Sequence, residues 1–135
     1  MNRFLFDKNV NADELSPLTL AFIGDTVFDM LVREDLICQA NRPANDLHNS
    51  AVKMVKASAQ AEFVEKLLPC LSEKEISVYK RGRNTKVGHL PKNASQADYH
   101  KATGLEALLG YLYLLHRYDR ITGLLKTGWE KLDLC

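Results

Sequence analysis

The sequence predicts an all-α protein, folded as a compact bundle around two apolar helices. Three helix-capping signals each precede a stretch of helix-forming sequence, and they are Ser16-Pro17, Ser72-x-x-Glu75 and Ser95-x-x-Asp98. No segment shows the apolar–polar alternation of a half-buried strand. With 135 residues, 46% of them hydrophobic, the chain can bury a core of its own, so we expect one domain over residues 1–135 with its core at about 15–133.

The first two helices are expected in the N-terminal half. The first begins at the Ser16-Pro17 cap and runs to about Cys38, and its apolar residues occupy nearly the whole circumference, which predicts a central, buried helix. The stretch ANRPAN predicts a turn. Asn45 or Asp46 is then expected to cap a second helix that continues to Pro69.

Three more helices are expected in the C-terminal half. The Ser72 cap opens EKEISVYKRGR, which is followed by NTKVGHLPKN, a loop because it combines glycine with proline. The Ser95 cap leads into the apolar segment ADYHKATGLEALLGYLYLLHRY. Asp119 is expected to cap the last helix, RITGLLKTGWEKL.

The sequence indicates a cytoplasmic protein. Its longest nearly uncharged apolar run, Leu105–Leu115, has eleven residues, too few to span a bilayer. The N-terminus has no long apolar segment of the signal-peptide type. The three cysteines Cys38, Cys70 and Cys135 lie far apart without C-x-x-C spacing, which favours a reducing compartment.

Charge is unevenly distributed although the net charge is only +1. Residues 1–36 hold three basic and seven acidic side chains, whereas residues 80–101 hold six basic side chains and one acid. This asymmetry suggests a cationic segment for a polyanion and an acidic site elsewhere, with a solvated charged loop as the alternative.

Asp25 interrupts the apolar run AFIGDTVFD directly after a glycine. On a helical wheel it lies just outside the polar strip, toward Phe28 and Val32, so we expect its carboxylate to be partly desolvated unless a cation lies against it. Gly24 lowers helix propensity by roughly 1 kcal/mol relative to alanine. It also permits close approach by another backbone or by a ligand.

Glu106 is the only acidic or basic residue between Ala102 and Leu115. A glutamate among leucines needs a partner. Either each isolated acid pairs with a cation such as Arg33, Arg117 or a lysine, or sits at the surface, or the two acids meet and hold a hard divalent cation such as magnesium. The residues by themselves leave these alternatives open.

Two motifs resemble the ribonuclease III family. AFIGDTVFDM resembles the family signature, and TGLEALLGYLYL resembles its second acidic motif. The intervening PANDLHNSAVKMVKASAQAEFV and KRGRNTK, together with the short length, are similar to the Mini-III branch, a catalytic domain without the C-terminal double-stranded-RNA-binding domain. The resemblance covers residues 15–133 or so and implies a helical bundle like the ribonuclease III catalytic domain.

The resemblance also implies roles for the two acids. Asp25 and Glu106 match the family's catalytic magnesium ligands. Ala21 and Thr103 stand where the larger family carries further acids, which leaves one or two metal ions per site open. Asp29 could support the site, although a solvated helix position is the plainer interpretation.

The activity implied by the resemblance is magnesium-dependent hydrolysis of double-stranded RNA by a homodimer. Members of the branch mature the ends of precursor 23S ribosomal RNA; no ribosomal-protein helper can be named from the sequence. The alternatives are a non-catalytic module of the same fold that binds structured RNA, and a helical interaction protein. Retention of both acids favours the enzyme, because binding alone requires neither.

The basic segment KRGRNTKVGHLPKN is the expected RNA-binding surface, since duplex RNA is recognised mainly by shape and charge. Its candidate contacts to phosphate and sugar are Lys80, Arg81, Arg83, Asn84, Lys86, Lys92 and Asn93. Lys53 and Lys56 are a weaker candidate extension. With few phosphate contacts per subunit, binding should be weak and salt-sensitive.

Overall fold

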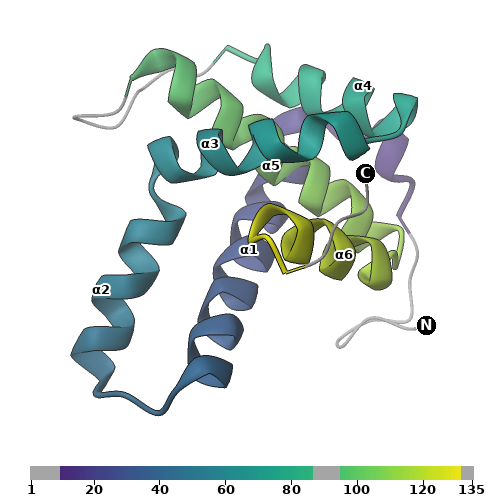
Figure 1. Ribbon diagram of the computed structural model, residues 1–135. Coiled ribbons are helices and arrows are strands. Elements are labelled where there is room, and N and C mark those ends of the chain that lie inside the picture. The colour runs from purple at the N-terminus through teal and green to yellow at the C-terminus, as the bar shows by residue number, and fades with distance from the viewer. Residues whose placement is uncertain (1–9, 87–94, 132–135) are drawn as a thin grey trace.

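The computed structural model describes residues 10–86 and 95–131, which form helices and turns without a strand (Figure 1). The α-helices are α1 (Pro17–Gln39), α2 (Ala44–Val55), α3 (Ala57–Leu67), α4 (Glu73–Arg83), α5 (Gln96–Leu114) and α6 (Tyr118–Gly128). Two short 3-10 helices, η1 (Ala12–Glu14) and η2 (Leu68–Cys70), precede α1 and α4. The predicted all-α class is confirmed. Within the described ranges, no helix has both the length and the apolarity needed to cross a bilayer.

Local capping chemistry sets the starts of the two central helices. The Ser16 hydroxyl accepts a hydrogen bond from the N–H of Thr19 at 3.3 Å, and Pro17 occupies the first turn of α1. The Ser95 hydroxyl likewise accepts from the N–H of Asp98 at 3.0 Å at the start of α5. Both predicted starts are therefore confirmed.

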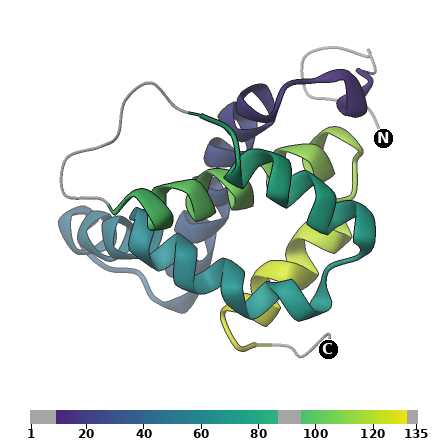
Figure 2. The same cartoon turned by 90° about the horizontal axis from the view of Figure 1, so that it is seen from above.

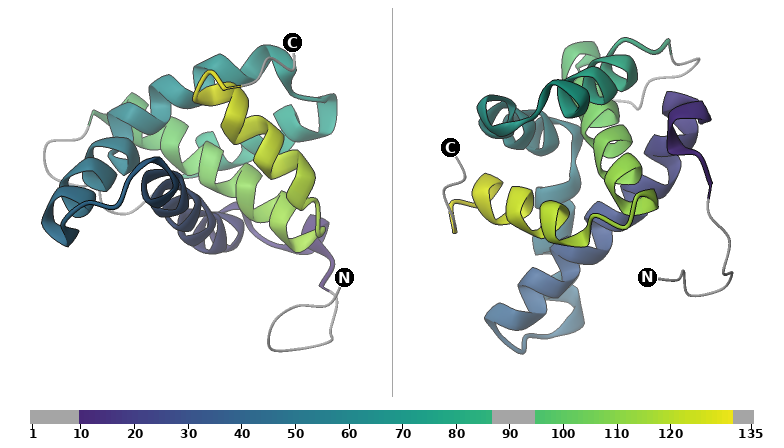
Figure 3. Two further views of the ribbon diagram at one scale, coloured as in Figure 1. Left: turned by 60° about the horizontal axis from the view of Figure 1, so that its bottom comes forward. Right: turned by 90° about the vertical axis from the view of Figure 1, so that its right-hand side faces the viewer.

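Helices α1 and α5 cross in close backbone contact, as the right-hand view of Figure 3 shows. A Cβ atom added at Gly24 would lie 1.7 Å from the carbonyl oxygen of Glu106, and one added at Gly110 would lie 1.9 Å from that of Leu20. Only glycine permits this approach. Of the two explanations considered for Gly24, close approach by another backbone is the one that the packing supports.

Helices α1, α3, α4 and α6 enclose α5, which is buried around most of its circumference. Helices α3 and α4 pack against it and are joined by the short η2 turn, as seen from above in Figure 2. Four leucines of α5 are fully buried, and they are Leu105, Leu108, Leu109 and Leu112. Beside them, the Phe63 ring lies 5.5 Å from the Phe28 ring and 5.8 Å from the Trp129 ring, which joins α3 to α1 and to the end of α6.

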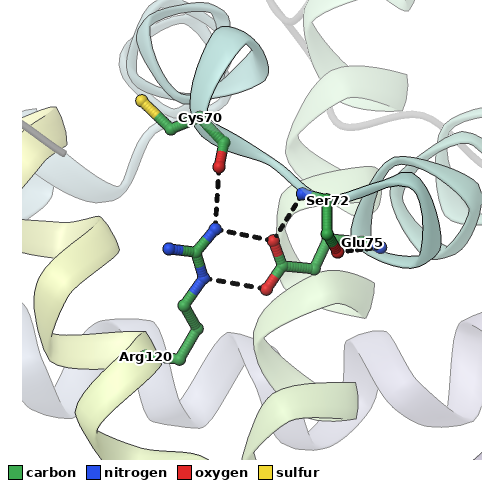
Figure 4. Close-up of polar contacts among 4 residues, drawn as sticks. All are labelled: Cys70, Ser72, Glu75 and Arg120. Carbon is green, nitrogen blue, oxygen red and sulfur yellow. Dashed lines mark hydrogen bonds and ion pairs between the residues drawn. The ribbon is translucent and has the colours of Figure 1, made fainter. Parts of the chain in front are cut away.

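A buried ion pair ties α6 to the start of α4 (Figure 4). Glu75 closes the predicted capping box with Ser72, since its carboxylate accepts from the Ser72 N–H at 2.9 Å. Arg120 donates two hydrogen bonds to the same carboxylate, at 2.8 and 2.9 Å, and a third to the Cys70 carbonyl at 2.8 Å. One carboxylate therefore caps one helix and fixes another.

The second predicted helix is wrong in extent. It is two helices, because the backbone becomes extended at Lys56 (ψ 154°) and so separates α2 from α3. The predicted caps Asn45 and Asp46 lie inside the first turn, since helical structure already begins after Pro43.

The predicted cap of the last helix is also wrong. His116 takes a left-handed conformation (φ 61°) that ends α5 in a tight turn, so α6 begins at Tyr118, one residue before Asp119. Asp119 then lies in the first turn, where its charge still suits the helix dipole.

Candidate active site

A cleft of about 740 Å³ opens where α1, α5 and the α2–α3 junction meet. Its lining includes four carboxylate side chains, and these are Asp25, Asp29, Asp98 and Glu106. Polar groups from α3 and α5 complete it, among them Ser58, Gln60, Ser95 and Thr103. The cleft is therefore acidic, as the sequence asymmetry suggested for a site outside the basic segment.

Asp25 and Glu106 come together because of the α1–α5 crossing. Gly24 lies against the Glu106 carbonyl, which places the next residue of α1 beside the Glu106 side chain. Asp25 is exposed rather than partly desolvated, because the cleft opens it to solvent, so that expectation is wrong. Burial of Glu106 and the charge of Asp25 raise the pKa of Glu106 to about 8, opposed by a hydrogen bond from Gln60.

No cation of the described residues neutralises this pair. Across residues 10–86 and 95–131, no lysine, arginine or histidine nitrogen forms a salt bridge with Asp25 or Glu106. Arg33, one of the cations considered, pairs with Asp29 at 3.2 Å instead. The interpretation of the two acids as separate ion pairs therefore finds no support in this part of the chain.

The donor set of the cleft suits a hard divalent cation. Two carboxylates in mutual repulsion gain from a shared cation, and their oxygens are the ligands that magnesium prefers. In the described part of the chain, no group of three or more His, Cys, Asp or Glu side chains is arranged as a metal site. A magnesium ion here would thus take most of its six ligands from water or from substrate phosphate.

Gln60 is a cleft residue that the sequence analysis missed. Its side chain is 4% exposed, and its Nε2 donates to the Val55 carbonyl at 2.7 Å and to Glu106 Oε2 at 3.4 Å. The available signal was the helical spacing, which places Gln60 on the same face as Phe63, Val64 and Leu67. Lys56, proposed only as a weak extension of the RNA surface, also lines the cleft.

The predicted RNA-binding residues lie at and just after the C-terminal end of α4. Lys80, Arg81, Asn84 and Lys86 are exposed. Arg83 is half-buried, with its guanidinium 5.6 Å from the centre of the Tyr79 ring. None of these five lines the cleft. The remaining two candidates, Lys92 and Asn93, lie outside the described residues.

Comparison with known proteins identifies the family. The model of the ribonuclease III domain matches residues 18–117. The Mini-ribonuclease 3 of Thermoanaerobacter sp. (strain X514) is 48% identical over 119 residues, which cover 88% of this chain and 84% of the relative. That of Symbiobacterium thermophilum is 45% identical over 119 residues, covering 88% and 92%.

A solved structure has a fold similar to that of this chain. The crystal structure of a protein from Fusobacterium nucleatum matches with a TM-score of 0.79 at 27% identity, over 87% of this chain and 93% of that one. The family match and the curated relatives, rather than this structure, decide against an ordinary helical interaction protein. The chain belongs to the ribonuclease III family, in its Mini-ribonuclease 3 branch, and is an endoribonuclease.

Proposed function

We propose that this endoribonuclease hydrolyses double-stranded RNA with magnesium held by Asp25 and Glu106, and that it matures the ends of precursor 23S ribosomal RNA in the cytoplasm. The observation that carries the proposal is the pairing of these two carboxylates, from distant parts of the chain, in one cleft where neither forms a salt bridge with a cation of the described residues. A non-catalytic RNA-binding module would gain nothing from two acids that repel each other and the phosphates of RNA.

The two carboxylates would hold the ion by their oxygens, with Asp25 on the open side of the cleft and the half-buried Glu106 on the inner side. A bound magnesium ion supplies an activated water and stabilises charge on the phosphate oxygens. The chain's own contribution is to fix the spacing of the two acids through the α1–α5 backbone contact. Hydrolysis then breaks the bond from phosphorus to the 3′ oxygen, without a covalent protein intermediate.

RNA would be held partly by the polar and basic side chains at and just after the C-terminal end of α4. The candidate contacts to phosphates and sugars outside the cleft are Lys80, Arg81, Arg83, Asn84 and Lys86, with Lys92 and Asn93 beyond the described residues, while Lys56 would contact RNA within the cleft. The separation of acidic from basic side chains suits the chemistry. The carboxylates would hold the metal ion at the scissile phosphate, while the lysine and arginine side chains would hold the other phosphates.

Two active sites would be joined in a homodimer. Two large apolar side chains on the N-terminal half of α1 face solvent, Leu18 with 44% and Phe22 with 82% of its surface exposed. Apolar exposure of this kind often marks a protein interface. A symmetric dimer through this face would bring together two copies of the helix that carries Asp25, one for each strand of a duplex.

The central experiment compares cleavage of a duplex RNA by wild type, Asp25→Asn and Glu106→Gln, with and without magnesium. Each variant should lower kcat at least about a hundredfold while folding normally, because it removes one anionic ligand and little volume. Asp119→Asn, the same change at an exposed position of α6, is the matched control and should cleave normally. Equal cleavage by wild type and both site variants would show that the acids are not catalytic.

A further inference from the structure

Gln60 lies in the cleft between the α2–α3 junction and the Asp25–Glu106 pair. The chain breaks helix at Lys56, so α2 ends and α3 begins within a few residues of one another beside the Asp25–Glu106 pair. Gln60 follows this break in the first turn of α3, and its side chain is 4% exposed. A buried amide on an apolar helix face is uncommon unless its polar atoms are used.

The amide is anchored to the main chain and directed at the acid. Its Nε2 donates a short hydrogen bond, 2.7 Å, to the carbonyl of Val55 at the end of α2. The same nitrogen lies 3.4 Å from Glu106 Oε2, a long contact at the outer limit of a hydrogen bond. Because the Val55 carbonyl can only accept a hydrogen bond, the nitrogen and not the oxygen of the amide must face it. The short bond therefore fixes the nitrogen, and the second amide hydrogen is left for the carboxylate.

We propose that Gln60 is a positioning residue of the endoribonuclease, which orients the Glu106 carboxylate for the cation by donating to its Oε2 from an amide anchored on Val55. The proposal rests on the function proposed above, in which Glu106 holds magnesium. Groups that orient a metal-binding side chain affect metal affinity or activity by about 10- to 100-fold when they are removed.

The remaining amide atom argues against a purely structural role. Gln60 Oε1 is buried and has no hydrogen-bond partner among the described residues. A position selected for stability alone would favour an apolar side chain of similar size, which leaves no acceptor unpaired. The amide thus carries a stability cost that the contact with Glu106 explains and that packing does not.

The test replaces Gln60 by methionine, which keeps the length of the side chain and removes its hydrogen-bonding groups. Binding of Mn²⁺ alone, without RNA, is followed through the electron paramagnetic resonance of the free ion, and kcat and KM for duplex RNA are measured separately. Gln60→Met should weaken Mn²⁺ binding about tenfold and lower kcat at limiting metal, with KM and the melting temperature little changed. Gln39→Met, the same change at an exposed position of α1, should leave all four quantities as in wild type.

Unchanged Mn²⁺ affinity and kcat in Gln60→Met would overturn the inference while leaving the proposed function intact. A lower melting temperature with unchanged metal affinity would also overturn the inference. In that case the hydrogen bond from Gln60 to Val55 would stabilise the fold without orienting Glu106. If wild type itself neither binds Mn²⁺ nor cleaves, the proposed function fails and the inference fails with it. Should Gln60→Met not fold, Gln60→Leu has a similar volume and also lacks the donor; wild-type cleavage by that variant would exclude the positioning role.

Discussion

At the scale of single residues, the geometry of the cleft depends on the absence of a side chain at Gly24, beside Asp25. Gly24 has no side chain, so the backbone of α5 lies where a Cβ atom would be, and this contact sets how far Asp25 is from Glu106. In an exposed helix the same glycine would simply cost stability, by roughly 1 kcal/mol relative to alanine. Here the cost is offset by helix packing, and the benefit is the geometry of the cleft.

Gly24→Ala should therefore destabilise the protein despite its better helix propensity. Its Cβ would lie 1.7 Å from a backbone oxygen that cannot rotate away, so the two helices must separate. We expect a loss of about 3 kcal/mol in the free energy of unfolding, measured by urea denaturation, and a loss of cleavage in the protein that remains folded. Gly123→Ala in α6 is the matched control and should be neutral or slightly stabilising. Equal stability of the two variants would contradict the role assigned to the backbone contact.

The sequence was enough to single out Asp25 and Glu106 among their neighbours. It did not predict how exposed to solvent each carboxylate is. Wheel geometry predicted a partly desolvated Asp25, whereas Asp25 is exposed and Glu106 is the more buried partner. The wheel shows which residues share a face of one helix, and exposure here depends on a cleft formed by three helices. Gln60 was missed for the same reason, because its contact with Glu106 joins residues far apart in sequence.

At the scale of helices, the local capping residues predicted where helices start. They did not predict the break between α2 and α3. The Ser16, Ser72 and Ser95 caps are satisfied within three residues, so their signal is entirely local. The break at Lys56 has no such signal, since the surrounding VKMVKASAQA contains neither glycine nor proline. Packing of α2 against α1 and of α3 against α5 decides that break, and tertiary contacts override propensity there.

The Glu75–Arg120 pair is the main polar link between helices, and removing one member should be costly. Glu75 is 4% exposed at its side chain and Arg120 30%. Arg120→Met leaves a buried carboxylate without its cation, so we expect a loss of about 3 kcal/mol in urea denaturation at pH 7. Lys66→Met, which breaks the exposed pair with Glu130, should cost less than about 1 kcal/mol.

The same pair predicts a dependence of stability on pH. Burial alone would raise the pKa of Glu75, but hydrogen bonds from Arg120 and from the Ser72 N–H outweigh it, so the pKa is lowered on folding. The ionised carboxylate therefore stabilises the folded state at pH values above the pKa of Glu75 in the unfolded chain, about 4.3. This stabilisation is lost as the pH falls through the lower pKa of Glu75 in the folded protein. The stability difference between wild type and Arg120→Met should therefore narrow below about pH 4. A difference independent of pH would assign the loss to packing.

At the scale of the whole molecule, the proposed dimer would use apolar side chains that one chain leaves exposed. Phe22→Ser should shift the protein from dimer toward monomer in sedimentation velocity, because Phe22 is the most exposed large apolar side chain of the described residues. Ile37→Ser, at a 63% exposed position near the other end of α1, is the control and should stay dimeric. A wild type that sediments as a monomer would exclude the dimer.

The basic segment predicts how RNA binding responds to salt. Replacing Arg81 and Arg83 together by alanine should weaken binding of a duplex at every ionic strength and lower the slope of log K against log salt by about 1 for each lost phosphate contact. Circular dichroism should show an unchanged fold. Lys126→Ala, an exposed change on α6, is the control. An unaltered slope in the double variant would remove this segment from the RNA surface.

The glycine contact between α1 and α5 also separates two properties that usually change together in enzymes. Main-chain atoms at Gly24 and Gly110 touch the facing helix directly, and the buried α5 leucines pack around this contact. An engineer could therefore repack that leucine core for a hotter or colder working temperature, provided that both glycines stay in place. Heat tolerance and the proposed catalytic geometry would then be separate design variables in this small enzyme.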